Sequence, residues 1–518
     1  MDTGGFFDNA DTRALIAKLG TASDWVIYVG LGGTIDRTGM SWDGLVAGLL
    51  GEFGLDAETR SLVVRKNGPI RAATMVESLF RASAATEDEA IITLRAAIAK
   101  LLYGPNRSMA GKILPSLAQF ALANAVKGQS VTFVTPNYDK YLHEAVTLAC
   151  VGNPDKAGDL IVLDPDVATD LTNIDFSLIN CFHLHGLVDG NDSKGIPVLG
   201  EQTYRDTTAA SAAFLKEVFS NKNVLIVGSS VTDTPLVNAL LDTVSTGKTT
   251  RRYAIQPLQS GEWQSITPAE RRKMIEWNKL RLNAMRVEPV HPDYYIQVAQ
   301  LFSEFERSVR FGDAAKMTLP RYKGRYSERL EKWWRTWERK TLSNSAEQPH
   351  AHERLRLLVK EVKEVVGIPA SEAIKAELWV RWEPHASRML ALWASSTGTW
   401  DDIGSIHKAP IGLQGKYRAV DMFCSGAPKF FHADDSRLPL HQQSRWRSYF
   451  GMPVWLEGPG GLLAVGTIAL ASMTDAKPAD ASTRPGSIAE TNLANLQKAI
   501  SLMAIAGDEL LSTEKSAD

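Results

Sequence analysis

The first 300 residues alternate short apolar, β-branched runs with stretches of helical length. Parallel strands need long crossover connections, usually helices, so this alternation predicts an α/β fold with a doubly wound, mostly parallel sheet. A long helical insertion is predicted at about residues 42–127. The predicted strands are Trp25–Val29, Val131–Thr135, Leu160–Leu163, Asn180–Leu184, Asn223–Val227, Tyr253–Gln256 and Met285–Val287.

The pattern changes after residue 353. An amphipathic helix is followed by runs in which apolar and polar residues alternate, which is typical of an antiparallel sheet. A closing helix is predicted at roughly 490–511, after a Pro-, Ala- and Ser-rich stretch at 476–488. The segments before that stretch are HERLRLLVKEVKEVVG (352–367), AELWVRWEP (376–384), SRMLALWASS (387–396) and a predicted hairpin within 445–472. The C-terminal part is therefore predicted to be an α+β domain.

Between these two patterns lie charged, tryptophan-rich helices and a polar segment, 341–353, that is predicted to be a linker. Trp333, Trp334 and Trp337 lie at helical spacing. They fit either a base-stacking surface or a packing stripe between domains, and the lack of a long basic run favours packing. The predicted domains are 1–305, a helical connector and linker at 306–353, and 354–518.

Composition narrows the class of protein. With 518 residues, 44% of them hydrophobic and 22% charged, the chain is expected to be globular with two or more domains. A net charge of −2 provides no general attraction to nucleic acid or membranes, so neither is expected as a partner. The start, MDTGGFFDNADTR, does not resemble a signal peptide, and no apolar run reaches the roughly 18–20 residues of a membrane span.

The three cysteines are scattered singly and form no CxxC pair. They are Cys150, Cys181 and Cys424. Neither a disulfide framework nor a zinc site is predicted, and a reducing, cytoplasmic location is expected.

Candidate chemistry lies where the predicted strands end. Gly30, Gly32 and Gly33 follow the first strand, and such glycines let a phosphate approach the backbone N–H groups closely. The G-x-G-x-x-G fingerprint of dehydrogenases fails, because Ile35 occupies the third glycine position. A tight turn after a buried strand is the alternative interpretation.

Polar residues follow two further predicted strands. Asn137 and Asp139 lie where ligands of open α/β sheets bind, although Pro-Asn-x-Asp also forms a simple turn. His183 and His185 point the same way on a strand, but no Asp, Glu or Cys cluster joins them, so metal binding is not predicted. His185, at the strand end, suits proton transfer or orientation of a ribose hydroxyl, and a structural role is the alternative.

A fourth strand ends in Gly228, Ser229 and Ser230, with Asp233 three residues on, and these small hydroxyl residues suit a ribose or a phosphate. The order of these motifs along the chain resembles that of the sirtuin superfamily. Successive strands are followed by a glycine cluster, by T-x-N-Y-D, by H-G and by G-S-S-x-x-x-D. The pattern resembles in particular the bacterial sirtuin-like NAD-hydrolysing domains of antiphage defence, such as the Thoeris effector. IPVLGEQTYRD (196–206) strengthens this resemblance, which covers roughly residues 20–300.

The resemblance implies a Rossmann-like fold and NAD as the substrate, and no metal is predicted because the cysteines form no CxxC pair. Asn137 and His185 match the catalytic pair of the family. Thr34 stands where the family usually has Ser, and Met40 stands where it usually has Pro. The predicted NAD-contacting residues are Gly30, Gly32, Gly33, Thr34, Asp139, Gly228, Ser229, Ser230 and Asp233.

Deacylases of the superfamily usually carry a zinc module with two CxxC pairs, which this chain cannot build. The resemblance therefore favours hydrolysis of NAD over deacylation. A zinc-less deacylase and a non-catalytic sensor of NAD or ADP-ribose are the alternatives.

The C-terminal domain resembles a GAF domain in GLQGKYRAVDMFCSGAPKFF (412–431) and RSYFGMPVWLEGPGGLLAVGTIALAS (447–472). GAF domains often hold small molecules, which implies a nucleotide-like activator or a protein trigger, and a ligand-free dimerisation module is the alternative. Together the two resemblances imply a homo-oligomeric NAD⁺ glycohydrolase that is gated by its C-terminal domain. Its expected role is antiphage defence through depletion of NAD.

Overall fold

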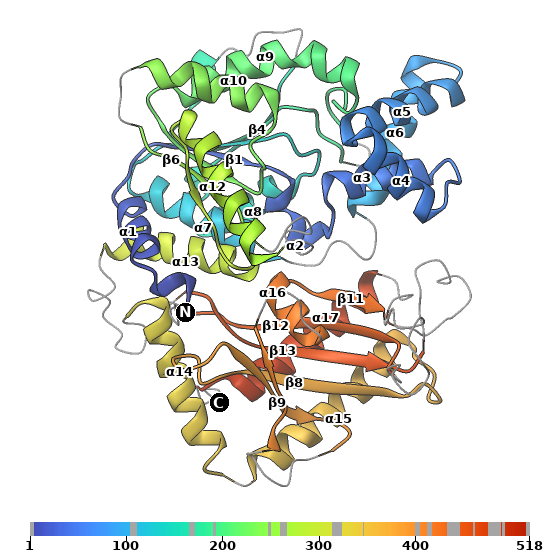
Figure 1. Ribbon diagram of the computed structural model, residues 1–518, viewed down its shortest axis with the longest axis vertical. Helices are drawn as coiled ribbons and strands as arrows, with labels where there is room; N and C mark the ends of the chain where they lie inside the picture. Colours follow the sequence, from blue (N-terminus) through green and yellow to red (C-terminus); the bar gives the residue numbers. More distant parts are fainter. Residues whose placement is uncertain are drawn as a thin grey trace. The chain divides into compact units, whose positions relative to one another are not determined.

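The computed structural model describes residues 5–103, 111–164, 171–189, 193–246, 250–258, 267–312, 324–344, 346–398, 405–411, 417–432, 446–458, 461–474, 488 and 493–513. The chain divides into two compact units (Figure 1). Lys18–Asp293 form one, here called the parallel unit. Met1–Ala17 and Tyr294–Asp518 form the other, here called the antiparallel unit.

The parallel unit contains a seven-stranded sheet in the order β3-β4-β2-β1-β5-β6-β7, with parallel pairing throughout. Its strands are β1 (Trp25–Val29), β2 (Val131–Thr135), β3 (Ala157–Val162), β4 (Ile179–His183), β5 (Asn223–Val227), β6 (Arg252–Ile255) and β7 (Glu288–Val290). Its helices are α2 (Ile35–Thr38), α3 (Trp42–Gly51), α4 (Ala57–Asn67), α5 (Pro69–Ser83), α6 (Glu87–Tyr103), α7 (Ile113–Val126), α8 (Tyr141–Ala149), α9 (Glu201–Phe219), α10 (Thr234–Asp242) and α12 (Pro268–Ala284), and α1 (Ala10–Leu19) ends in it. The predicted parallel α/β sheet is confirmed.

One predicted strand is wrong. Residues 285–287 form a turn after α12, in which Arg286 has φ +53° and its N–H donates to the Asn283 carbonyl. The strand lies at Glu288–Val290 instead. Met285 and Val287 are buried in the core, so this turn has the apolar content of a strand without its backbone geometry.

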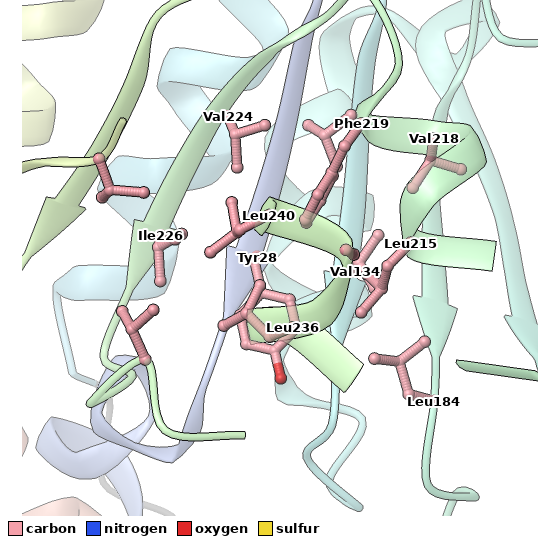
Figure 2. Packing of buried hydrophobic residues seen from close by; sticks show 14 of the residues in the cluster. Tyr28, Val134, Leu184, Leu215, Val218, Phe219, Val224, Ile226, Leu236 and Leu240 are labelled. Carbon is pink, nitrogen blue, oxygen red and sulfur yellow. The ribbon is translucent and has the colours of Figure 1, made fainter. Parts of the chain in front are cut away.

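Helices cover both faces of the parallel sheet. Successive strand residues point to opposite faces, and on β1 the Trp25 ring contacts Phe120 of α7 while Tyr28 packs in the cluster under α9 and α10. Figure 2 shows this cluster, in which Ile226 of β5 and Leu240 of α10 lie beside Tyr28. Burial on both faces explains why these strands read as continuous apolar runs.

The predicted helical insertion is confirmed between β1 and β2. Helices α3 to α6 pack around a core of their own and gather together in Figure 1. Tyr138 and Val188, from segments that follow β2 and β4, join this core. The insertion is therefore anchored at the carboxyl edge of the sheet.

The antiparallel unit contains a six-stranded sheet in the order β10-β9-β8-β13-β12-β11, with antiparallel pairing throughout. Its strands are β8 (Ile374–Trp382), β9 (Met389–Ser395), β10 (Lys408–Pro410), β11 (Lys429–His432), β12 (Ser448–Leu456) and β13 (Leu463–Ser472). Its helices are α13 (Ile296–Phe311), α14 (Tyr326–Thr341), α15 (Glu347–Val366), α16 (Arg418–Ser425) and α17 (Leu493–Leu511). The predicted antiparallel sheet and its closing helix are confirmed, whereas residues 476–487 lie outside the described part of the chain.

The tryptophan stripe of α14 packs within the antiparallel unit. Trp334 contacts Trp382 of β8, and Trp337 contacts Trp393 of β9. All three α14 tryptophans are buried, so the base-stacking interpretation is wrong. The partners belong to the same unit, so the stripe builds a domain core.

The predicted linker at 341–353 is mostly helix, because α15 begins at Glu347 and buries Ala351. Apart from Pro349, the other side chains in this stretch of α15 are polar, and that composition concealed the helix. Residues 294–305 also belong to the antiparallel unit, so the division falls before the predicted boundary at 305. Among the described residues, no helix is long and apolar enough to cross a membrane.

Candidate functional site

Four of the segments that follow strands meet at one edge of the parallel sheet. Strands β4, β2, β1 and β5 are consecutive neighbours and parallel, so their carboxyl ends share this edge. The pairing registers align Thr135 with His183 and Val29 with Val227. The predicted site residues, which follow these four strands, are therefore brought to one place in the fold.

The glycine loops after β1 and β5 touch each other through their backbones. The Gly30 N–H donates to the Val227 carbonyl and the Gly32 N–H to the Gly228 carbonyl, both at 2.8 Å. A Cβ at Gly30 would lie 2.7 Å from the Gly228 oxygen. At Gly228, where φ is +65°, a Cβ would lie 1.9 Å from the Gly33 nitrogen. The approach of the two loops therefore requires glycine at these positions.

Asp36 connects the segment after β1 to the start of α7 by a hydrogen bond. Thr34 is fully buried and donates to the Leu31 carbonyl at 3.1 Å. The Asp36 carboxylate accepts from the Ile113 N–H at 2.8 Å, at the start of α7. Burial raises the pKa of Asp36 to about 6. Met40, at the position where the family usually has Pro, is buried in the core of the insertion.

Asn137 is held by its backbone. Its N–H donates to the Thr135 hydroxyl at 3.0 Å, and its carbonyl lies 2.9 Å from His183 Nδ1. Only 6% of the residue is exposed. A side-chain amide that its backbone holds at the strand end is suited to hold a ligand oxygen.

The two histidines at the end of β4 and just after it have different environments. His183 is fully buried, its pKa is lowered to about 4 by burial, and its Nδ1 faces the Asn137 carbonyl. His185 lies two residues further on, and its buried Nε2 has no partner in the described residues. Burial also lowers the pKa of His185, which favours the neutral imidazole that can accept a proton.

Asp233 is the N-cap of α10, and donors already surround its carboxylate. Leu236 N–H and the Tyr28 hydroxyl donate to Oδ2 at 3.4 and 3.1 Å, and the Tyr204 hydroxyl donates to Oδ1. The Tyr204 ring lies edge-on to the His185 imidazole. Tyr204 and Thr234 also line a depression of about 500 Å³.

The sequence interpretation missed both tyrosines. Tyr204 lies in the EQTYRD segment that supports the resemblance, and Tyr28 is the polar-tipped residue in the apolar run of β1. A phenol in such a run is a usable signal, because a buried tyrosine hydroxyl normally needs a partner.

The serines after Gly228 make local hydrogen bonds. Ser229 accepts from the Val231 N–H at 3.1 Å, and the Ser230 hydroxyl lies 2.7 Å from that of Thr232. Arg281 of α12, another residue that the sequence interpretation missed, donates to the Ser230 carbonyl at 2.8 Å. Arg281 therefore fixes the backbone of this loop.

Asp139 lies behind Asn137 and is 1% exposed. Its Oδ1 accepts from the Tyr141 N–H at 3.2 Å, while its Oδ2 has no partner within the described residues. Burial raises the pKa of Asp139 to about 6, against the opposing charge of Arg37. Among the described residues, no three His, Cys, Asp or Glu side chains form a group that could hold a metal ion.

Residues 131–288 match the family model of a SIR2-like domain. The match supports a sirtuin-like domain and NAD-related chemistry. It includes Asn137, Asp139, His185 and the 228–233 loop, and it begins after the Gly30–Gly33 segment. No curated protein matches the chain.

The contact between the glycine loops predicts a large loss of stability in Gly228→Ala. The new Cβ would meet backbone in a conformation with positive φ, so the free energy of unfolding should fall by more than about 3 kcal/mol. Denaturant unfolding of the full chain measures this loss. In the control, Gly54→Ala, φ is +78° and no atom lies within 4 Å of the new Cβ, so about 1 kcal/mol is expected. Equal losses in the two variants would contradict the interpretation.

The buried Asp139 predicts a pH-dependent stability. Its pKa rises from 3.8 to about 6 on folding, so between these values the unfolded chain releases the proton first and stability falls as pH rises. Relative to Asp139→Asn, the free energy of unfolding of the wild type should fall by up to about 3 kcal/mol from about pH 4 to about pH 7. Asp175 is a control, because hydrogen bonds from Ser177 lower its pKa. Relative to Asp175→Asn, the free energy of unfolding of the wild type should therefore rise with pH. Parallel curves for wild type and Asp139→Asn would refute the assignment.

Proposed function

We propose that the parallel unit is an NAD⁺ glycohydrolase, which cleaves the bond between nicotinamide and ribose. One observation carries the proposal: Asn137 and His185 follow neighbouring parallel strands, both residues are buried, and His185 Nε2 has no hydrogen-bond partner within the described residues. The match to a SIR2-like domain supports NAD as the ligand at this edge. Open α/β sheets bind ligands at the carboxyl ends of their strands.

The chemistry suits these two side chains. Cleavage at the glycosidic carbon passes through an oxocarbenium-like state, and nicotinamide leaves as a neutral molecule. A water oxygen then bonds to that carbon, and its proton passes to the neutral imidazole of His185. The Asn137 amide holds the water or a ribose oxygen without adding a charge that would repel the phosphates of NAD.

The antiparallel unit is proposed to gate this activity. Its helices and antiparallel sheet suit a GAF-like module that responds to a small molecule or a protein trigger, directly or through homo-oligomer assembly. An ungated hydrolase would deplete the NAD of its own cell. A gated one fits the proposed role in antiphage defence, in which infection releases the activity.

Incubation of the purified chain with NAD alone tests the activity. We expect release of nicotinamide, and we expect Asn137→Ala and His185→Ala each to lower its rate by about 10²-fold or more, because each removes a group that acts in the transition state. Chromatography of free nicotinamide measures the rate. Turnover that requires an acyl-lysine peptide would indicate the zinc-less deacylase, and binding without turnover under every candidate activator would indicate the sensor.

Two exposed residues provide controls for these variants. Asn283 lies on α12 and His350 on α15, and both side chains are exposed. Asn283→Ala and His350→Ala should therefore keep the wild-type rate. Wild-type rates in well-folded Asn137→Ala and His185→Ala would refute the catalytic pair.

Gating is tested by the fragment 18–293, which follows the boundary of the parallel unit. A cut at 341 would separate α14 from its partners Trp382 and Trp393, and would expose the tryptophan core. We expect the NAD turnover of the fragment to differ from that of the full chain by about tenfold or more, in the range of typical coupling between sites. A folded fragment with the oligomeric state and basal rate of the full chain would contradict gating.

A further inference from the structure

We propose that Tyr204, tethered by Asp233, is a positioning residue that orients the imidazole of His185. The inference rests on the proposed function in one respect, because His185 is the group that accepts the proton. It gives Asp233 a role through Tyr204, in place of the direct NAD contact that the sequence predicts.

The phenol oxygen of Tyr204 is fixed from two directions. It donates to Asp233 Oδ1 and accepts from the Thr234 N–H at 2.9 Å. Thr234 is the first residue of α10, so the hydroxyl of an α9 side chain is tied to the N-terminus of the neighbouring helix. A phenol with both a donor and an acceptor has little freedom to rotate or withdraw.

Asp233 is itself anchored to the centre of the sheet. The hydroxyl of Tyr28, on β1, donates to Oδ2 at 3.1 Å, and the Leu236 N–H donates to the same oxygen at 3.4 Å. Tyr28 is fully buried, and Figure 2 shows its ring among the residues of the core. The chain of contacts thus runs from the core strand through a carboxylate to the tyrosine beside His185.

The Tyr204 ring is the aromatic partner of the imidazole. The two ring centroids are 5.8 Å apart with an interplanar angle of 72°, an edge-to-face arrangement. A catalytic histidine is commonly oriented by a hydrogen bond to its second nitrogen. Within the described residues, His185 Nε2 has no hydrogen-bond partner, and the ring contact with Tyr204 supplies the orientation in this proposal.

The carboxylate also acts on the imidazole through space. Among the described residues, Asp233 is the charged group that raises the pKa of His185 against the effect of burial, and Tyr204 is the titratable group in ring contact. Burial raises the pKa of Tyr204, so its phenol stays protonated and continues to donate. The negative charge favours the imidazolium that forms when His185 accepts a proton.

Tyr204→Phe, Asp233→Asn and the double variant in the full chain test the proposal. Tyr204→Phe keeps the ring and removes the tether, so kcat for NAD should fall by about tenfold or more while KM stays within about twofold. Asp233→Asn should behave in the same way. The double variant should be no slower than the slower single variant, because the two residues act as one unit.

A matched control is Tyr294→Phe, which removes a buried tyrosine hydroxyl that donates to the Ile411 carbonyl at 2.8 Å in the antiparallel unit. It should show the kcat of the wild type. A raised KM with unchanged kcat in Asp233→Asn would overturn the proposal in favour of direct NAD contact. Losses that multiply in the double variant would overturn it as well.

A titration of His185 separates this inference from the proposed function. In protein with ¹³Cε1-labelled histidine, the His185 resonance is the one that His185→Gln removes. Its pKa should be lower in Asp233→Asn, and its chemical shift should change in Tyr204→Phe. These results in a chain that releases no nicotinamide under any candidate activator would refute the glycohydrolase and keep the positioning contact. An unchanged resonance in both variants would overturn the contact, whatever the activity.

Discussion

The candidate site depends on a contact between two backbones. The loops after β1 and β5 join through the Gly32 N–H and the Gly228 carbonyl, at a distance that no Cβ could tolerate at Gly228. The contact fixes the path of residues 228–233, and hence the place of Asp233 at the start of α10. From there the Asp233 carboxylate reaches Tyr204, whose ring lies against His185. The glycines therefore serve the proposed chemistry by setting the frame of the site.

Some of the buried polar atoms without partners lie at this edge of the sheet. Asp36 Oδ1, Asp139 Oδ2 and His185 Nε2 all lack a hydrogen bond within the described residues. Each such atom costs about 1–3 kcal/mol of desolvation, and folded proteins keep few of them. These three lie at the carboxyl ends of β1, β2 and β4, where this fold class binds ligands, which is consistent with a ligand site at this edge.

The local pattern of apolar and polar residues predicted most of the fold. Continuous apolar runs and the residues that end them predicted the parallel sheet, and Asn137 and His185 follow its strands as expected. Buried turns were beyond this reasoning, since Met285 and Val287 have the composition of a strand. The hydrogen bond between Tyr204 and Asp233 was also beyond this reasoning, because the two residues meet only when α9 packs beside α10. Spacing along the chain cannot show which helices become neighbours.

The distribution of the site within the chain bears on the role of the antiparallel unit. Every residue assigned to the site, from Gly30 to Asp233, lies within Lys18–Asp293. The antiparallel unit has a sheet, a tryptophan core and covering helices of its own, and it supplies none of the proposed catalytic groups. A second domain that the chemistry does not use needs another reason to be on the same chain. Control of the proposed NAD hydrolysis would be such a reason, and the proposed gating requires only that the domain bias the geometry around His185.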